Sequence, residues 1–189
     1  MIPSLDRLRH VASSCTSCVL SETRVQVVVG SGEASARLMV VGEAPGANED
    51  AQGQPFVGRS GALLVELIGE ELGLSRSEIF LTNVVKCRPP ANRDPRASEA
   101  IACRPFLLDE MRLVTPTVIV TVGNAATRAV LETRAGISTL RGRVHHSELA
   151  TAPVVPTFHP AAALRGGPKV VASMRADLQV AGELLAGDR

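Results

Sequence analysis

The chain has 189 residues, 45% of them hydrophobic and 21% charged, which suits one substantial core and excludes a disordered or fibrous protein. Its 20 Lys and Arg nearly balance its 19 Asp and Glu, so a polyanion would have to be bound by a local basic face. No run of about 18 apolar residues occurs, and the N-terminal sequence lacks the layout of a secretion signal. We therefore expect a soluble, cytoplasmic monomer with a single domain over residues 1–189 and no membrane partner.

Apolar segments of strand length alternate with segments of helical periodicity along most of the chain. An amphipathic pattern predicts a helix over residues 5–13, and a long loop is predicted after Gly46. Strands are predicted at 38–41, 79–83, 117–122 and 154–157, helices at 60–72, 99–113, 124–131 and 168–185, and a further strand at 142–146. Strands separated by helices indicate an α/β protein, a three-layer α/β/α fold around a central four-stranded, mainly parallel sheet.

Polar and glycine-bearing segments follow each of the predicted strands. They span residues 42–46, 83–90, 123–124 and 157–165. In folds of this class, ligands bind outside the carboxyl ends of the strands. The four segments therefore predict a single site at that edge of the sheet.

The four cysteines form two pairs that only folding can bring together. Cys15 and Cys18 have the spacing C-x2-C, whereas Cys87 and Cys103 lie far apart in the sequence. In a reducing compartment a disulfide framework is an unfavourable use for them, and four thiolates suit zinc or an iron–sulfur cluster. The spacing does not choose between these two, and the alternative is that Cys87 and Cys103 are small buried apolar residues.

Two loops before and after residue 50 carry groups suited to binding a base. The segment from Gly42 to Gly46 offers backbone N–H groups and the Glu43 carboxylate, although an ordinary turn with a solvated Glu has the same pattern. Phe56 lies between glycines and a proline in a chain with only 2% aromatic residues. A phenylalanine held in a polar loop can stack on a base.

Two further side chains follow predicted strands. Asn83 ends the second strand, where its amide faces the expected site or caps a turn. His159 precedes Pro160, which stiffens its loop, while His10, His145 and His146 have no such placement. Basic residues flank both segments and either form a solvated face or contact phosphates, and they are Lys86, Arg88, Arg93, Arg96, Arg165 and Lys169.

Over nearly its whole length the chain resembles the family 4 uracil-DNA glycosylases, the iron–sulfur class of these enzymes. The resemblance rests on motifs that occur in the family's order together with its cysteine spacing. They are Gly42-Glu-Ala-Pro-Gly46, Glu49-Asp50, Gly53-x-Pro-Phe-Val-Gly-Arg59, Thr82-Asn-Val-Val-Lys-Cys-Arg-Pro-Pro90, Cys103-x-Pro-Phe106 and His159-Pro160.

The resemblance implies a [4Fe-4S] cluster held by the four cysteines, and a partner, uracil-containing DNA, in single or double strands. The implied uracil pocket consists of Gly42, Glu43, Ala44, Pro45, Glu49, Phe56, Asn83 and His159. The residues expected to contact DNA are Lys86, Arg88, Leu164 and Arg165. In this interpretation the cluster pins the N-terminal segment to the segment between Cys87 and Cys103.

The implied reaction is hydrolysis of the N-glycosidic bond of uracil, with its base flipped out of the stack. Leu164 would fill the gap, Phe56 would stack on uracil, and Asn83 would pair with its O4 and N3–H edge. His159 would donate a hydrogen bond to the negative charge that develops at O2, and Glu43 or Glu49 would orient water or steady the sugar cation. Ala44 stands where many uracil glycosylases carry Asp, so water activation by that route is excluded.

Two alternatives remain open from the sequence. One is a glycosylase for another deaminated base, such as hypoxanthine or xanthine. The other is a non-catalytic iron–sulfur module that binds DNA without releasing a base.

Overall fold

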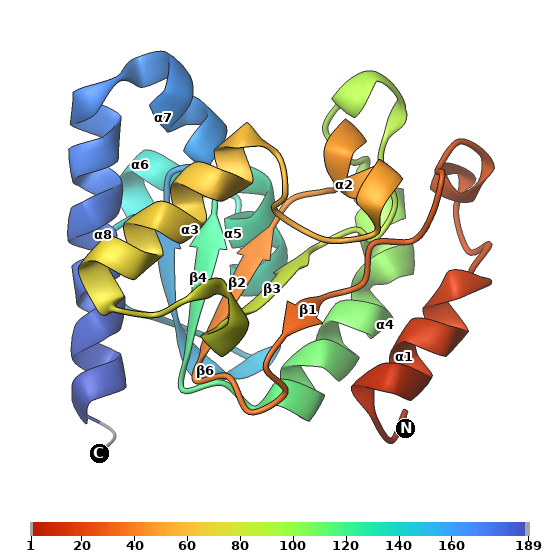
Figure 1. Ribbon diagram of the computed structural model, residues 1–189, viewed down its shortest axis with the longest axis horizontal. Coiled ribbons are helices and arrows are strands. Elements are labelled where there is room, and N and C mark those ends of the chain that lie inside the picture. Colours follow the sequence, from red (N-terminus) through yellow and green to blue (C-terminus); the bar gives the residue numbers. More distant parts are fainter. Residues whose placement is uncertain (1, 188–189) are drawn as a thin grey trace.

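A six-stranded mixed sheet lies between two layers of helices in the computed structural model, which describes residues 2–187 (Figure 1). The strand order is β1-β3-β2-β4-β6-β5. The strands are β1 (Ser31–Gly32), β2 (Leu38–Gly42), β3 (Phe80–Asn83), β4 (Val118–Val122), β5 (His145–Ser147) and β6 (Ala150–Thr157). The strands β3, β2, β4 and β6 run parallel, whereas β1 and β5 pair antiparallel at the two edges.

The parallel strands read as continuous apolar runs because both of their faces are covered. Every residue of β2, β3 and β4 is buried. From β2 the chain goes first to β3 on one side and later to β4 on the other, so the strand order reverses at β2. A reversal of this kind opens a crevice at the carboxyl ends of the strands, and Gly42 and Asn83 lie side by side there.

The helices divide between the two faces of the sheet. Those on one face are α3 (Arg59–Leu72), α7 (Pro160–Gly166) and α8 (Pro168–Gly187), and those on the other are α1 (Leu5–Ser13), α4 (Ala97–Val114) and α5 (Asn124–Leu131) (Figure 1). Short helices α2 (Ala47–Gln52) and α6 (Ile137–Leu140) complete the fold. No helix within residues 2–187 has the length and apolar character needed to span a bilayer.

The expected α/β fold with a parallel centre is confirmed, but the sheet has six strands rather than the predicted four. The strand β1 has only two residues, too few for any alternation to show, and β5 spans 145–147 rather than 142–146. The helices α2 and α7 lie in segments read as loops. Their six and seven residues make fewer than about two turns, which is too short for a helical period to be recognised.

The N-terminal segment is attached to the rest of the fold by apolar packing and by hydrogen bonds. Leu8 and Ala12 of α1 are fully buried in a cluster that includes Phe106 of α4. Beyond the helix, the buried Asp50 carboxylate accepts hydrogen bonds from the backbone N–H groups of Val25 (3.0 Å) and Gln26 (3.4 Å). These contacts place the C-x2-C segment beside the start of α4.

Candidate functional site

The floor of the pocket at the sheet edge is built on Gly42, the last residue of β2. A Cβ atom at this position would lie 2.4 Å from Asn83 Oδ1 and 2.6 Å from Phe56 Cζ. Both distances are far below van der Waals contact, so only glycine permits the two side chains to meet there. The sequence prediction that Gly42, Phe56 and Asn83 share one site therefore describes their observed arrangement.

The position of the Phe56 ring is set by an unusual backbone conformation and by hydrogen bonds to the neighbouring carbonyls. Its φ of 56° lies in the left-handed region, which is unfavourable for a residue with a Cβ. The Arg76 guanidinium donates hydrogen bonds to the carbonyls of Phe56 (3.0 Å) and Pro55 (2.5 Å). Gly61 gives the loop room, since a Cβ there would lie 2.4 Å from the Phe56 carbonyl. Arg76 was not recognised from the sequence.

The Asn83 side chain is 3% exposed and ends β3. Within residues 2–187 its amide makes no recorded hydrogen bond, although the residue is nearly enclosed. Its main-chain carbonyl is held separately, by the Lys86 ammonium at 2.6 Å. The amide is thus free to bind a ligand, which disfavours the alternative that Asn83 is a turn cap.

Two carboxyl groups face each other on the other side of the pocket. Burial, the charge of Asp94 and a hydrogen bond with Asp94 together raise the pKa of Glu43 to about 7, and burial is the largest of the three causes. Both residues line the same pocket. Asp94 follows a run of proline and arginine and carried no sequence signal that linked it to Glu43. Near neutral pH, Glu43 therefore exists both with and without its proton.

The Glu49 carboxylate is occupied by the backbone. Its Oε1 accepts hydrogen bonds from Gly58 N–H (2.7 Å) and Val57 N–H (3.0 Å), and its Oε2 accepts one from Gly46 N–H (3.1 Å). These bonds join the two ends of the loop that carries Phe56. Glu49 thus lines the pocket and holds the loop in place. No backbone N–H group within residues 2–187 donates to the Glu43 carboxyl, which is therefore the one better able to bind a water molecule or a ligand.

His159 precedes α7 and caps its first turn. The backbone N–H of Ala161 donates to Nδ1 of His159 at 3.1 Å. Burial lowers the pKa of His159, and the nearby Arg165 charge lowers it further. Since Nδ1 accepts a hydrogen bond, the neutral ring carries its proton on Nε2 and is a donor there. The ring packs on Gly123, whose φ is 90°.

The rim of the pocket carries some of the residues predicted to contact DNA. Leu164 of α7 is 53% exposed, and Arg165 beside it is exposed and lines the pocket. The Arg88 Nε donates to Asn92 Oδ1 at 2.7 Å, which orders this basic loop. Ala44 and Pro45 line the pocket as predicted.

The prediction that Lys86 contacts DNA is wrong. Its side chain is 1% exposed, and its ammonium lies 2.7 Å from Glu110 Oε2 in the interior. A phosphate cannot reach it without breaking this ion pair. Lys86 stands in a loop beside other basic residues, so its local sequence does not distinguish a buried side chain from one that faces DNA.

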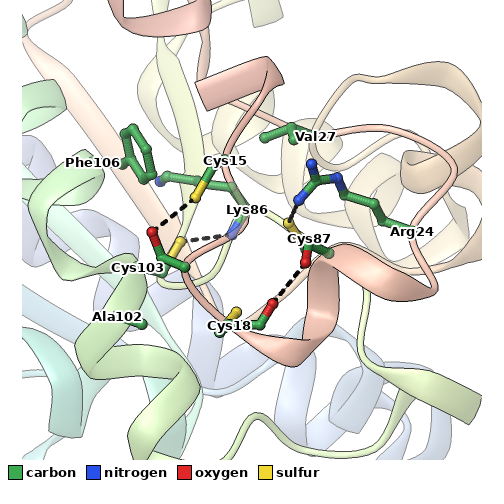
Figure 2. A pocket seen from close by; sticks show the side chains of 11 residues that line it. Cys15, Cys18, Arg24, Val27, Lys86, Cys87, Ala102, Cys103 and Phe106 are labelled. Atoms are coloured by element: carbon green, nitrogen blue, oxygen red, sulfur yellow. Dashed lines mark hydrogen bonds between the residues drawn. The ribbon is translucent and has the colours of Figure 1, made fainter. Parts of the chain in front are cut away.

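The four cysteines line a second cavity, between the N-terminal segment and α4 (Figure 2). None of them forms a disulfide, and Cys87 and Cys103 are buried. Arg24 Nη1 donates to Cys87 Sγ at 3.4 Å, and the Lys86 backbone N–H donates to Cys103 Sγ at 3.2 Å (Figure 2). Burial raises the pKa of both thiols, that of Cys103 to about 11. Donors directed at the sulfurs favour their thiolate form once a metal group replaces the protons.

Among residues 2–187, no group of three or more His, Cys, Asp or Glu side chains is arranged to hold one metal ion. Such an arrangement is the one that a single ion requires. In a cubane cluster each of four thiolates binds a different iron, so the sulfurs do not share one centre. The donor set of four thiols around one cavity is the set that such a cluster requires.

The chain is similar to known proteins over most of its length. Residues 29–179 match the family model described as the Uracil DNA glycosylase superfamily. The Type-4 uracil-DNA glycosylase of Sulfurisphaera tokodaii is 43% identical over 167 residues, covering 85% of this chain and 76% of its own. That of Thermotoga maritima is 44% identical over 152 residues, covering 80% and 78% respectively. That of Archaeoglobus fulgidus is 37% identical over 187 residues, covering 96% and 93%.

Proposed function

The chain belongs to the uracil DNA glycosylase superfamily, and on that premise we propose that it hydrolyses the N-glycosidic bond of uracil in DNA and leaves an abasic site. The observation that carries this proposal is the meeting of Phe56 and Asn83 above Gly42. A planar apolar ring and an unpaired amide in one enclosed corner suit a flat base with a polar edge. The partner is uracil-containing DNA.

Phe56 and Asn83 divide the recognition of uracil. The Phe56 ring stacks on the base, a contact worth about 1–3 kcal/mol in comparable sites. The Asn83 amide pairs with O4 and N3–H of uracil, whereas a cytosine at the same place would pair only with an amide that is turned over. The enclosure of Asn83, which is 3% exposed, supports recognition of the base because an amide that does not pair with it would be poorly hydrated.

His159 stabilises the leaving base. Bond cleavage places negative charge on uracil, and a neutral imidazole with its proton on Nε2 can donate a hydrogen bond to O2. The hydrogen bond from Ala161 to Nδ1 supports this role because it selects that tautomer. A preorganised donor of this kind contributes about 10²–10³ in rate.

Glu43 orients the attacking water. Its ionised form accepts a proton from water or steadies the positive sugar, and its pKa of about 7 lies where both forms are present. Glu49 holds the loop around Phe56 in place and takes no part in the reaction, because three backbone N–H groups already donate hydrogen bonds to its carboxylate.

The exposed end of α7 contacts the DNA around the flipped nucleotide. Leu164 fills the gap in the base stack, and Arg165 and Arg88 contact phosphates. Extrusion costs a few kcal/mol, which the wedge and the stacking on Phe56 offset.

Cys15, Cys18, Cys87 and Cys103 would hold a [4Fe-4S] cluster. The cluster would cross-link the N-terminal segment to the segment between Cys87 and Cys103, which follows Asn83 in the chain, and we assign it this architectural role. The predictions of a monomer and of a cytoplasmic location are part of the same proposal.

Base release from a panel of oligonucleotides tests the proposal. Each strand carries one uracil, hypoxanthine, xanthine or thymine, and free base is measured after incubation with the iron-loaded protein. Release of uracil alone is the expected result. Release of hypoxanthine or xanthine without uracil would assign another lesion, and salt-sensitive binding with no release would support a DNA-binding module in place of an enzyme.

A further inference from the structure

A buried ion pair lies directly behind the Asn83 backbone. Lys86 Nζ is 2.7 Å from Glu110 Oε2, and their side chains are 1% and 0% exposed. The ammonium also donates to Thr82 Oγ1 at 2.7 Å and to the Asn83 main-chain oxygen at 2.6 Å. Each of its three N–H groups thus has one acceptor.

The Glu110 carboxylate is equally well satisfied. Its Oε1 accepts a hydrogen bond from Gly30 N–H at 2.8 Å, and its Oε2 accepts one from the Thr82 hydroxyl at 2.6 Å in addition to the ammonium. The network joins β3, α4 and the segment before β1. A buried ion pair is seldom worth more to stability than apolar residues of the same volume, so its contribution to the fold does not by itself explain this arrangement.

The position of the Asn83 amide depends on the backbone that carries it. No side-chain hydrogen bond within residues 2–187 orients this amide, and Asn83 is the last residue of β3. One side of its backbone is fixed by Gly42, whose carbonyl accepts a hydrogen bond from Val84 N–H at 2.8 Å. The Lys86 ammonium holds the Asn83 carbonyl on the other side.

We propose that Lys86 and Glu110 are positioning residues for uracil recognition, which hold the Asn83 backbone so that its amide is presented to the base beside Phe56. Lys86 acts through Asn83 and does not touch uracil or DNA. The inference rests on the proposed function, because it names how that pocket is kept in shape.

Three variants separate positioning from stability. Lys86→Met leaves the Glu110 charge buried without a partner, and Glu110→Gln does the same to the Lys86 charge. The double variant Lys86→Met/Glu110→Gln buries no charge, and the amide oxygen that it introduces can still accept the hydrogen bond from Gly30. The double variant therefore restores the balance of charge while the Asn83 carbonyl stays unsupported.

The matched control is Arg112→Met, which removes an ion pair with Asp109 on the same helix, α4, at a surface position, together with a hydrogen bond to the Ile2 carbonyl. For every variant we would measure four quantities: the thermal midpoint of unfolding, the iron content, the affinity for DNA that lacks uracil and so cannot be cleaved, and the inhibition constant of free uracil. Free uracil reports the pocket alone, and the DNA affinity reports the rest of the surface.

The expected result is that both single variants have lower thermal midpoints and that the double variant recovers most of that loss. Its inhibition constant for uracil should nevertheless remain about tenfold weaker, because a displaced Asn83 amide loses one hydrogen bond to the base. Iron content and DNA affinity should match those of Arg112→Met. Recovery of uracil affinity together with the thermal midpoint would overturn the inference.

Thr82→Val provides a second test if the double variant does not fold. It removes one acceptor of the ammonium and keeps the ion pair, so a few-fold weaker uracil inhibition with an unchanged affinity for the uncleavable DNA is expected. Unchanged inhibition would overturn the inference. Wild-type protein that neither releases nor binds uracil would instead overturn the proposed function, and the two failures are thereby distinguished.

Discussion

The backbone N–H of Ala161 donates a hydrogen bond to Nδ1 of His159 at 3.1 Å, and this contact leaves Nε2 as the donor toward the pocket. Replacing His159 with Leu should lower the single-turnover rate of uracil release by about 10²–10³, since one preorganised donor to the leaving base is lost. DNA affinity should change little. A variant that retains the full rate would remove His159 from the mechanism.

The pair of Glu43 and Asp94 predicts the pH dependence of the reaction. Because the pKa of Glu43 is raised to about 7 and its ionised form orients water, activity should increase as pH rises through neutrality. Asp94→Asn removes the repulsive charge and should shift the acid limb of the profile to lower pH. The check is a profile of single-turnover rates, and an unmoved limb would show that Asp94 does not act on Glu43.

The same carboxyl affects stability in the opposite direction. The raised pKa means that folded Glu43 keeps a proton which the unfolded chain releases above its ordinary pKa of 4.5. Its contribution to the free energy of unfolding is therefore fully present below that pH and is lost as pH rises toward 7. Glu43→Gln should flatten this part of the stability profile, measured by denaturant unfolding.

Arg76 holds the left-handed turn at Phe56 through two carbonyls. Arg76→Met should raise the KM for uracil DNA by about tenfold, because the turn relaxes and stacking on the base weakens. The maximal rate should fall less. The control is Arg175→Met, which removes ion pairs between α8 and α3 outside the pocket. Equal KM values for the two variants would contradict this role of Arg76.

Leu164 predicts a difference between double-stranded and single-stranded substrates. Leu164→Ala should reduce uracil release from a duplex about tenfold and from a single strand much less, because only a duplex leaves a gap to fill. The two rates are compared in parallel at one salt concentration. The same loss on both substrates would show that Leu164 is not a wedge.

The features of the fold that could be predicted are those determined by residues close together in the sequence. The apolar runs of β2, β3 and β4 indicate a parallel sheet, so Asn83 at the end of β3 and His159 after β6 must lie at its carboxyl edge. The edge strand β1 has two residues and leaves no pattern to read.

The contacts that hold the site residues in place could not be predicted, because they join residues that are far apart in the sequence. Arg76 reaches back to Phe56, and Lys86 turns inward to Glu110 of α4. A basic residue in a loop next to other basic residues has the same local sequence whether it faces DNA or a buried carboxylate. Only the folded structure shows which of these Lys and Arg residues are buried and which are exposed.

If Asn83 and Phe56 form a uracil pocket, the most direct test is to measure the free uracil that the wild-type protein and Asn83→Ala release from a single-uracil oligonucleotide. We predict release by the wild type, none from the matching thymine strand, and a loss of at least about 10²-fold in Asn83→Ala at unchanged iron content and DNA affinity. Full activity in Asn83→Ala, or no uracil released by iron-loaded wild-type protein that binds the strand, would contradict the account.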